Sequence, residues 1–295
     1  MNNIVRRSRE NKALAIIAFI IILLLIITMF NTGDREPRYD EQWYLHNTGE
    51  NPGILEENDD FSNLLKGNDV NAERMWAYYQ DIDKESRSST IVAIIDTAVD
   101  FTHEDLKNCA WNNPYEVPND GIDNDLNGYV DDVHGYDFTT TRNNEFEIPH
   151  ATMCAGIIAS SKNNKGILGV AFPSQVKIMS LKVLNFDGVD IYGTIEDTIQ
   201  AIKYAEENGA KICNLSLDTR YNDAELSKTI KESKMLFTVS CGNGGENIDY
   251  QPRYPACYNY VNVITVANLS YNGMLNNTFG YGKKVLILQL LGQQC

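Results

Sequence analysis

The sequence has 295 residues, of which 43% are hydrophobic and 22% charged, so it is long enough and apolar enough to bury a large core. Its formal net charge is −15, and no basic patch interrupts the main part of the chain, which argues against binding to nucleic acid or to anionic lipid headgroups. The same acidity suits a protein that binds cations.

The first apolar segment, Ala13–Phe30, is eighteen residues long and contains no charged residue. It follows a stretch that is rich in arginine and lysine, and it just reaches the length of a bilayer span. We therefore predict a cytoplasmic basic tail over 1–12 and a transmembrane signal-anchor helix over 13–30, with a cleaved signal peptide as the alternative. Either way the acidic main part is expected outside the cytoplasm, held at the cell membrane or secreted.

Residues 31–89 form a polar N-terminal extension with one short helix expected at 71–79. Beyond it, apolar runs alternate with helical patterns. Strands are expected at 91–96, 176–183, 211–217, 235–241 and 261–267, and helices at 150–160, 194–208 and 224–232. This alternation predicts an α/β fold in which helices flank a doubly wound parallel sheet.

Polar residues stand at the ends of three of these elements. The first strand ends at Asp96, a helix begins at His150, and Asn243 follows the strand at 235–241. Chemistry in parallel sheets gathers at the carboxyl ends of the strands. A carboxylate that orients an imidazole produces a general base, and an amide can donate a hydrogen bond to a developing oxyanion. Each residue alone is more often a turn or surface residue, but the three together predict a catalytic site.

The segment Asp120–Asp132 (DGIDNDLNGYVDD) is a second candidate site. Alternating side-chain oxygens on a tight loop converge on one point, which suits a hard cation. We predict a structural Ca²⁺ ion here, and the alternative is a solvated acidic loop closed by Asx-turns. The expected ligands are Asp123, Asp125, Asn127, Asp131 and the backbone carbonyl of Tyr129.

The six cysteines show no disulfide pattern. Cys154, Cys213 and Cys241 lie within apolar segments and are expected to be buried thiols. Cys109, Cys257 and Cys295 are expected to be more accessible, and the disulfide state stays open.

Several motifs of this sequence resemble those of the subtilisin-like serine proteases, or subtilases. Asp96-Thr97-Ala98-Val99 matches the Asp motif of that family except at Ala98, and His150–Gly156 matches its His motif except at Ala151. Gly242-Asn243 matches the oxyanion motif, and the three motifs stand in the family's order. The resemblance extends from about Tyr39 to Lys284.

The resemblance implies roles for these residues. Asp96 would orient the imidazole of His150, which would take the proton of a serine nucleophile, and Asn243 would stabilise the oxyanion. A peptide or protein substrate would lie along Leu215-Ser216-Leu217 and Gly242. Asp105 corresponds to a calcium ligand of the family.

The sequence departs from the family most clearly near its end. No Gly-Thr-Ser-Met-Ala segment occurs, so the catalytic domain over 90–284 is expected to be incomplete, ending before the serine. The segment Val285–Gly292 reads VLILQLLG where subtilases have a sequence like VVDIAAPG. Codons for Leu-Ile-Leu-Gln-Leu-Leu-Gly also encode Asp-Ile-Ala-Ala-Pro-Gly in another frame. We therefore interpret 285–295 as an out-of-frame tail produced by a single-base deletion near codon 285.

Two functions follow from these observations. The first is a serine endopeptidase of subtilisin type, inactive as written because the serine is missing. The alternative is a non-catalytic, calcium-dependent binding or scaffold domain built on a protease fold. Ala98, Ala151 and Asp218, each at a position where the family prefers glycine, fit this alternative.

Overall fold

The computed structural model describes residues 35–50, 65–83, 87–139, 148–172, 176–269, 273–275, 278–282 and 287–291. The predicted basic tail and membrane segment lie outside these ranges. Among the helices inside them, none combines the length and the hydropathy that crossing a membrane requires.

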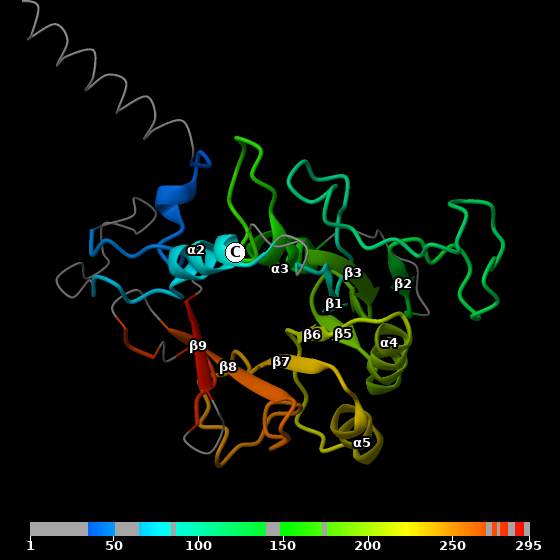
Figure 1. Ribbon diagram of the computed structural model, residues 1–295. Coiled ribbons are helices and arrows are strands. Elements are labelled where there is room, and N and C mark those ends of the chain that lie inside the picture. The colour runs from blue at the N-terminus through cyan, green and yellow to red at the C-terminus, as the bar shows by residue number, and fades with distance from the viewer. Residues whose placement is uncertain are drawn as a thin grey trace, which may run out of the picture.

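A parallel sheet of seven strands forms the centre of the described part, in the order β2-β3-β1-β6-β7-β8-β9 (Figure 1). Every pairing between neighbours in this sheet is parallel. The predicted α/β fold with a parallel sheet is thereby confirmed. The strands are β1 (Thr90–Asp96), β2 (Gly135–Asp137), β3 (Val176–Lys182), β6 (Ile212–Leu215), β7 (Leu236–Ser240), β8 (Val263–Leu269) and β9 (Ile287–Leu291).

Strand β1 lies inside the sheet, between β3 and β6. Its residues Ala93, Ile94 and Ile95 are completely buried, because helices cover both faces of the sheet at this point. A strand that is buried on both sides requires a continuous apolar run, which is what residues 91–95 provide. The run ends at Asp96, which is paired in register with Lys182 of β3.

The helices divide between the two faces. Helix α3 (His150–Ala159) packs through Ala151 and Ala155 in one apolar cluster with Val92 and Ile94 of β1. Side chains of a strand alternate between faces, so the other residues of β1 point the opposite way. They pack against α4 (Ile195–Glu207), which lies beside α5 (Ala224–Glu232), as Figure 1 shows. The side chains of Thr194 and Asp223 cap α4 and α5 by accepting hydrogen bonds from backbone N–H groups.

The N-terminal extension packs onto the segment that follows α3. It contains a short 3₁₀ helix, η1 (Tyr39–Glu41), and α2 (Ala72–Asp81). Tyr39, Leu45 and Trp76 are buried in one cluster with Leu168. The indole N–H of Trp76 also donates a hydrogen bond to the carbonyl of Val170, at 2.8 Å.

Two further features have no counterpart in the sequence-based prediction. A small antiparallel hairpin joins β4 (Leu184–Phe186) to β5 (Ile191–Gly193). In addition, β9 lies within the segment that we interpreted as an out-of-frame tail, and it pairs with β8 in a register that sets Leu288 beside Val266. The segment therefore has strand geometry next to the last predicted strand.

Candidate active site

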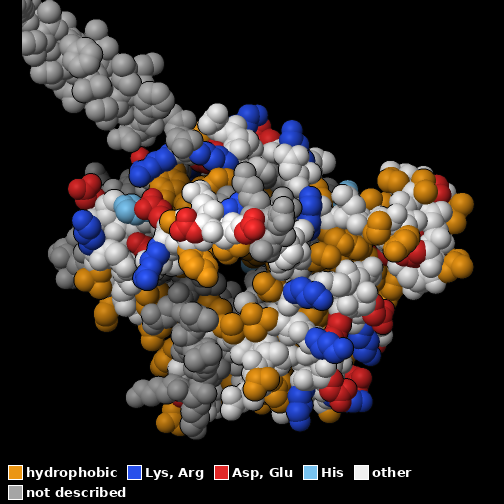
Figure 2. All heavy atoms as spheres, in the orientation of Figure 1, with side chains coloured by type: hydrophobic (Ala, Val, Ile, Leu, Met, Phe, Trp, Pro, Cys, Tyr) orange, Lys and Arg blue, Asp and Glu red, His pale blue; other side chains and the backbone are white. Residues whose placement is uncertain are grey.

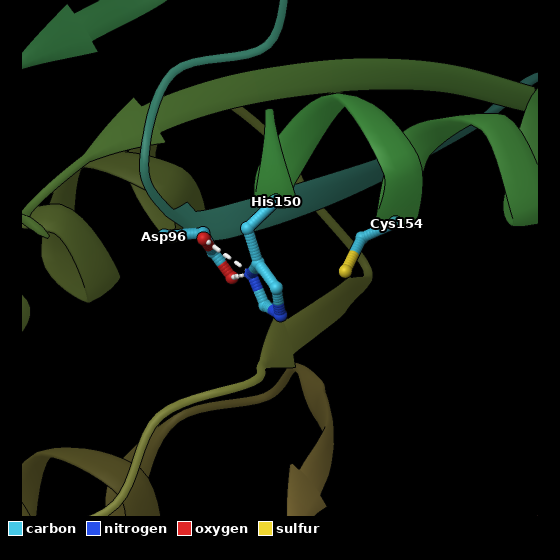
Figure 3. Close-up of side chains that lie close together, drawn as sticks. All are labelled: Asp96, His150 and Cys154. Atoms are coloured by element: carbon cyan, nitrogen blue, oxygen red, sulfur yellow. Dashed lines mark hydrogen bonds and ion pairs between the residues drawn. The ribbon is translucent and has the colours of Figure 1, made fainter. Parts of the chain in front are cut away.

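Asp96 and His150 contact each other at the carboxyl edge of the sheet. The Nδ1 atom of His150 lies 2.8 Å from Oδ1 and 2.9 Å from Oδ2 of Asp96 (Figure 3). Asp96 is fully buried, whereas the His150 side chain is 39% exposed. A carboxylate only accepts, so Nδ1 carries the proton and Nε2 is left with its lone pair. This arrangement gives an oriented imidazole with one basic nitrogen.

Thr97 connects the end of β1 to the start of α3. Its backbone N–H donates to Oδ1 of Asp96 at 2.6 Å, which fixes the carboxylate from the strand side. Its hydroxyl accepts from the backbone N–H of Ala151 at 3.0 Å and donates to the carbonyl of Ile148 at 3.2 Å. The residue next to the acid thus anchors the first turn of the helix that presents the base.

The carboxylate changes the acidity of the imidazole. The hydrogen bond from His150 to Asp96 favours the protonated ring and raises the pKa of His150 above its ordinary value of 6.5, although partial burial acts in the opposite direction. The methyl groups of Ala98 and Ala151, where the family prefers glycine, do not prevent this contact. Ala151 is completely buried directly beside the pair.

Asn243 lies at the same edge of the sheet, two strands away. It follows β7, which is separated from β1 only by β6. The chain turns here through Gly242, whose φ of +88° suits glycine, and the Gly242 N–H donates to the hydroxyl of Ser240 at 3.1 Å. The side chain of Asn243 is exposed, and its position after a strand terminus leaves its amide available to a ligand.

The predicted substrate segment, Leu215-Ser216-Leu217, begins at the last residue of β6, and Ser216 and Leu217 follow that strand. Leu215 is completely buried, and Leu217 is partly buried and packs against the main core. Ser216 accepts a hydrogen bond from the side-chain amide of Asn214 at 2.9 Å. Its hydroxyl also lies 3.9 Å from the sulfur of Cys154 on α3.

The acidic loop projects from the body of the molecule and carries exposed apolar side chains among its carboxylates (Figure 2). Asp123 and Asp125 each offer an oxygen to a cluster in which the ligand atoms lie within 4.8 Å of one another. Asn127 instead uses its side-chain carbonyl to accept from the N–H of Tyr129, and Asp131 accepts from the backbone of residues 120 and 121. Of the predicted acidic ligands, Asp123 and Asp125 belong to this cluster, whereas Asp131 does not.

Asp105 lies apart from this loop. Its carboxylate accepts a hydrogen bond from the side-chain amide of Asn163 at 2.7 Å. The Oδ1 atom of Asn163 is buried and has no hydrogen bond within the described residues. The carboxylate of Asp105 and the side-chain oxygen of Asn163 thus form a second group of neighbouring oxygen atoms, separate from the acidic loop.

Comparison with known proteins identifies the family. The sequence profile of the Subtilase family matches residues 87–286, which is more than half of the chain. This chain belongs to the subtilase family. The resemblance found in the sequence motifs is thereby confirmed, and the family is one of serine-protease-type hydrolases.

Several named proteases are similar to this subtilase. Subtilisin-like protease 1 of Plasmodium falciparum (isolate 3D7) is 29% identical over 245 residues, covering 77% of this chain and 35% of that protein. The cell wall-associated protease of Bacillus subtilis (strain 168) is 31% identical over 249 residues, covering 83% and 23%. The thermophilic serine proteinase of Bacillus sp. (strain AK1) is 30% identical over 210 residues, covering 70% and 44%. This subtilase therefore spans less than half the length of each of these relatives.

Solved structures share the fold. The epidermin leader peptide processing serine protease of Staphylococcus aureus aligns with a TM-score of 0.52 at 22% identity, covering 81% of this chain and 59% of that one. A psychrophilic subtilisin-like protease of Pseudoalteromonas sp. AS-11 aligns with a TM-score of 0.51 at 24% identity, covering 69% and 41%. At these identities the likeness concerns the fold alone.

The sequence did not identify three further features that lie next to the predicted site residues: Glu116, the ion pairs of Arg253, and Cys154. Glu116 is the third member of the cluster with Asp123 and Asp125, although it lies outside the alternating motif. Arg253 pairs with Asp218 at 2.8 Å and with Glu246 at 2.7 Å, next to the backbone at Gly242. The only hint of this network was the acidic residue after Ser216-Leu217.

The third missed group is Cys154. It is half-buried rather than buried, whereas Cys213 and Cys241 are buried as expected. Its sulfur belongs to a cluster with His150 and Asp96 (Figure 3). The expectation for Cys109 was wrong: its side chain is buried, because it packs under Leu106 and Ile178 in the cluster below α3. The helical spacing from His150 to Cys154 was the available signal.

Proposed function

We propose that Asp96, His150 and Asn243 are the acid, base and oxyanion residues of a subtilisin-type serine endopeptidase that cleaves peptide or protein substrates. The observation that supports this best is the contact of Nδ1 of His150 with both oxygens of a fully buried Asp96, at 2.8 and 2.9 Å. Membership of the subtilase family supports the same assignment.

Each residue has a defined part in the proposed reaction. Nε2 of His150 accepts the proton of a serine hydroxyl as the hydroxyl oxygen attacks the peptide carbonyl, and it later returns the proton to the leaving amine. Asp96 stabilises the imidazolium that forms in between. The side-chain amide of Asn243 donates to the oxyanion, and the backbone at Leu215-Ser216-Leu217 and Gly242 aligns the substrate.

The proposed reaction also needs a serine nucleophile. Residues 1–295 do not contain the Gly-Thr-Ser-Met-Ala motif that carries this serine in the family. A single-base deletion near codon 285 accounts for this, and sequencing of the locus tests it. A Gly-Thr-Ser segment encoded downstream in the shifted frame is the expected result. Unrelated sequence in that frame would refute the deletion.

A fluorophosphonate probe tests the catalytic assignment in the protein produced from the restored frame. We expect covalent labelling of one serine, and His150→Ala should slow it by about 10³-fold or more, because the hydroxyl loses its base. His46→Ala is a matched control, since His46 contacts Glu73 and not the residues of the proposed catalytic site. Equal labelling of the His150→Ala variant and the control would contradict the role of His150.

The same experiment addresses the alternative of a non-catalytic, calcium-dependent binding or scaffold domain. Ala98, Ala151 and Asp218, at positions where the family prefers glycine, favour this alternative. A restored-frame protein that is folded, as judged by circular dichroism, and yet is not labelled would support it. Labelling of one serine would exclude it.

We also propose that the acidic loop holds a structural Ca²⁺ ion through Glu116, Asp123 and Asp125. These three side chains supply carboxylate oxygens, the donor type that Ca²⁺ prefers. The donor set has a further sign of a missing cation: Glu116 is 9% exposed, and its Oε2 makes no hydrogen bond within the described residues. The ion would neutralise a buried carboxylate and fix the loop.

Thermal unfolding tests the calcium proposal. Saturating Ca²⁺ should raise the Tm of the full chain, because a ligand that binds only the native state stabilises it. Glu116→Gln should weaken this response, whereas Glu232→Gln, at an exposed position of α5, should leave it unchanged. An identical Ca²⁺ response in both variants would remove Glu116 from the site.

Finally, we propose that Ala13–Phe30 anchors the chain in the cell membrane with the acidic main part outside the cytoplasm. The support is the uncharged apolar sequence behind a basic cluster. Fusing a reporter that is active only outside the cytoplasm after residue 89 tests the orientation. Absence of reporter activity, with the fusion present in the cytoplasm, would contradict it.

A further inference from the structure

Apolar side chains are exposed on the acidic loop and just before it (Figure 2). Neither the proposed reaction nor the proposed Ca²⁺ site uses them. Single exposed apolar side chains are common in proteins, but several in one small region indicate a contact surface. We call this group the loop surface, and it consists of Tyr115, Val117, Ile122, Leu126 and Val130.

Hydrogen bonds hold the chain segments of the loop surface together. The backbone N–H groups of residues 120 and 121 donate to the carboxylate of Asp131, at 3.1 and 3.2 Å, so the segment before Ile122 lies against the residue after Val130. The base of the loop is fixed through the buried Asp132. A surface that is already ordered loses little conformational entropy when a partner binds.

Leu126 is the most exposed member of the loop surface, at 87%. Its φ of +60° lies in the left-handed region, which a residue with a bulky side chain rarely adopts. The backbone N–H of the next residue, Asn127, donates to the carboxylates of Asp123 and Asp125, at 3.1 Å in both cases, and this fixes the turn. The loop thus holds a large apolar side chain in solvent, where it is available to a partner.

The charge around the loop surface has a single sign. Residues 108–141 contain no lysine and no arginine. Asp120 is exposed and Asp131 is half-buried, and neither belongs to the carboxylate cluster of the proposed Ca²⁺ site, so both stay charged when that site is filled. Each carboxylate oxygen has more than one lone pair and can accept from a basic side chain in addition to its present donors.

This charge decides which occupant fits the loop surface. Nucleic acid and anionic lipid carry the same sign as the loop, and hydrocarbon would take its carboxylates out of water without pairing them. In a symmetric dimer the surface would face itself, so Asp120 and Asp131 would meet the same residues of the second copy. A basic protein segment avoids each of these costs.

We propose that the loop surface binds a protein segment in which lysine or arginine residues flank apolar side chains. The apolar side chains of the segment cover Ile122 and Leu126, and its basic side chains pair with Asp120 and Asp131. This binding needs neither a serine nucleophile nor the proposed catalytic residues, so it is independent of the proposed proteolysis.

A fluorescein-labelled peptide, Lys-Lys-Leu-Lys-Leu-Lys-Lys, tests the proposal by fluorescence anisotropy. The full chain is kept in micelles of a neutral detergent with excess Ca²⁺, and micelles without protein give the blank. We expect saturable binding, and the combined change Leu126→Ser and Ile122→Ser should weaken it by more than tenfold, because two apolar contacts are lost. The matched control is Val261→Ser, at a fully exposed valine just before β8. No saturable binding, or equal affinity of the double variant and the control, would overturn the proposal.

Two further peptides separate the apolar contribution from the charge. A peptide with glutamate in place of each lysine should not bind, and raising NaCl from about 10 to 150 mM should weaken binding of the lysine peptide, because salt screens the attraction. A peptide with serine in place of each leucine should bind more weakly to the unchanged protein. Equal affinity for the leucine and the serine peptides would show attraction by charge alone and refute the role of the loop surface.

The remaining outcomes concern folding and self-association. Should the double variant not fold by circular dichroism, Leu126→Asn serves in its place, because asparagine tolerates a positive φ. Light scattering after size-exclusion chromatography measures the mass of the chain without peptide. A doubled mass that is lost in Leu126→Asn, together with no binding of the lysine peptide, would make a second copy the occupant and would overturn the proposal.

Discussion

At the scale of single residues, Asp96 controls the charge state of the imidazole beside it. The carboxylate is fully buried, so its interaction with His150 is little screened by water. Thr97 holds the same carboxylate from the strand side at 2.6 Å. The pair is thus fixed before any substrate binds, which is the condition for an efficient general base.

Asp96→Asn should lower the pKa of His150 toward its ordinary value of 6.5, because the hydrogen bond to a carboxylate is the largest cause of the raised pKa. Titration of the histidine ring protons by NMR measures this. His134 is the internal control, since its Nδ1 contacts the carbonyl of Trp111 and not Asp96. A His150 titration curve that does not move would show that Asp96 exerts no such control.

The raised pKa also has a consequence for stability. Protonated His150 binds Asp96 more strongly in the folded state, so its stabilising effect is fully present below pH 6.5 and is lost as the pH rises through the higher pKa of the folded state. Urea unfolding of wild type and His150→Gln should therefore differ more at pH 5.5 than at pH 9. The His150 side chain is 39% exposed, which limits the difference to about 1 kcal/mol or less. A larger difference at pH 9 would contradict the expected sign.

At the scale of elements, one buried carboxylate ties the acidic loop to helix α4. Asp132 is completely buried and accepts from the hydroxyl of Tyr204 on α4 at 2.6 Å, from Asn113 at 2.8 Å and from Asn127 at 2.9 Å. Burial and this hydrogen bond raise the pKa of Tyr204 well above its usual range. The loop projects into solvent, but its base is fixed by these bonds.

Tyr204→Phe should reduce the free energy of unfolding by about 1.5–3 kcal/mol, because the buried carboxylate of Asp132 loses one of its hydrogen-bond donors. Denaturant unfolding measures this. Tyr221→Phe, at a side chain that is 75% exposed, is the control and should have almost no effect. Equal effects of the two substitutions would show that the Asp132 contact contributes nothing.

Strand β9 protects the edge of the sheet. It pairs with β8 over residues 265–269 and leaves β8 with a neighbour on both sides. Deleting residues 285–295 should expose the backbone N–H and C=O groups of β8 and promote association between chains. Light scattering after size-exclusion chromatography measures this. A deletion variant with the same mass distribution as the full chain would show that β9 has no such effect.

At the scale of the whole molecule, the net charge of −15 opposes compaction through repulsion between carboxylates. Raising NaCl from about 10 to 150 mM shortens the screening length from roughly 30 to 8 Å. The Tm should therefore rise with NaCl in the absence of divalent cations. A Tm that falls or stays constant over this range would indicate that attractive ion pairs, such as that between Arg253 and Asp218, outweigh the repulsion.

The long apolar elements could be predicted from the sequence because their burial is periodic. The strand expected at 91–96 is β1, and the helix expected from His150 is α3. Strands β2, β4 and β5 have three residues each, which is too short for any periodicity. The extended segment at 287–291 was read as an out-of-frame tail, so its pairing with β8 was not foreseen.

The candidate site could be predicted in part. Asp96 and His150 were foreseen to meet because a strand end and a helix start face the same crevice of a parallel sheet. Glu116 lies outside the alternating pattern of the acidic loop, and Arg253 lies 35 residues after Asp218, so no spacing in the sequence indicates their contacts. We predicted a buried thiol for Cys154 because its neighbours in the sequence are apolar. Its spacing of four residues from His150 indicates that the two side chains share one helix face.

The strand order has a consequence for how the chain is made. Strand β1 is synthesised long before both of the strands that flank it in the sheet, because β3 begins at Val176 and β6 ends at Leu215. Asn243 appears later still. The emerging polypeptide therefore cannot bring the three proposed catalytic groups together while its central part is being translated. The order of the strands thus places the meeting of the three groups after the synthesis of β7.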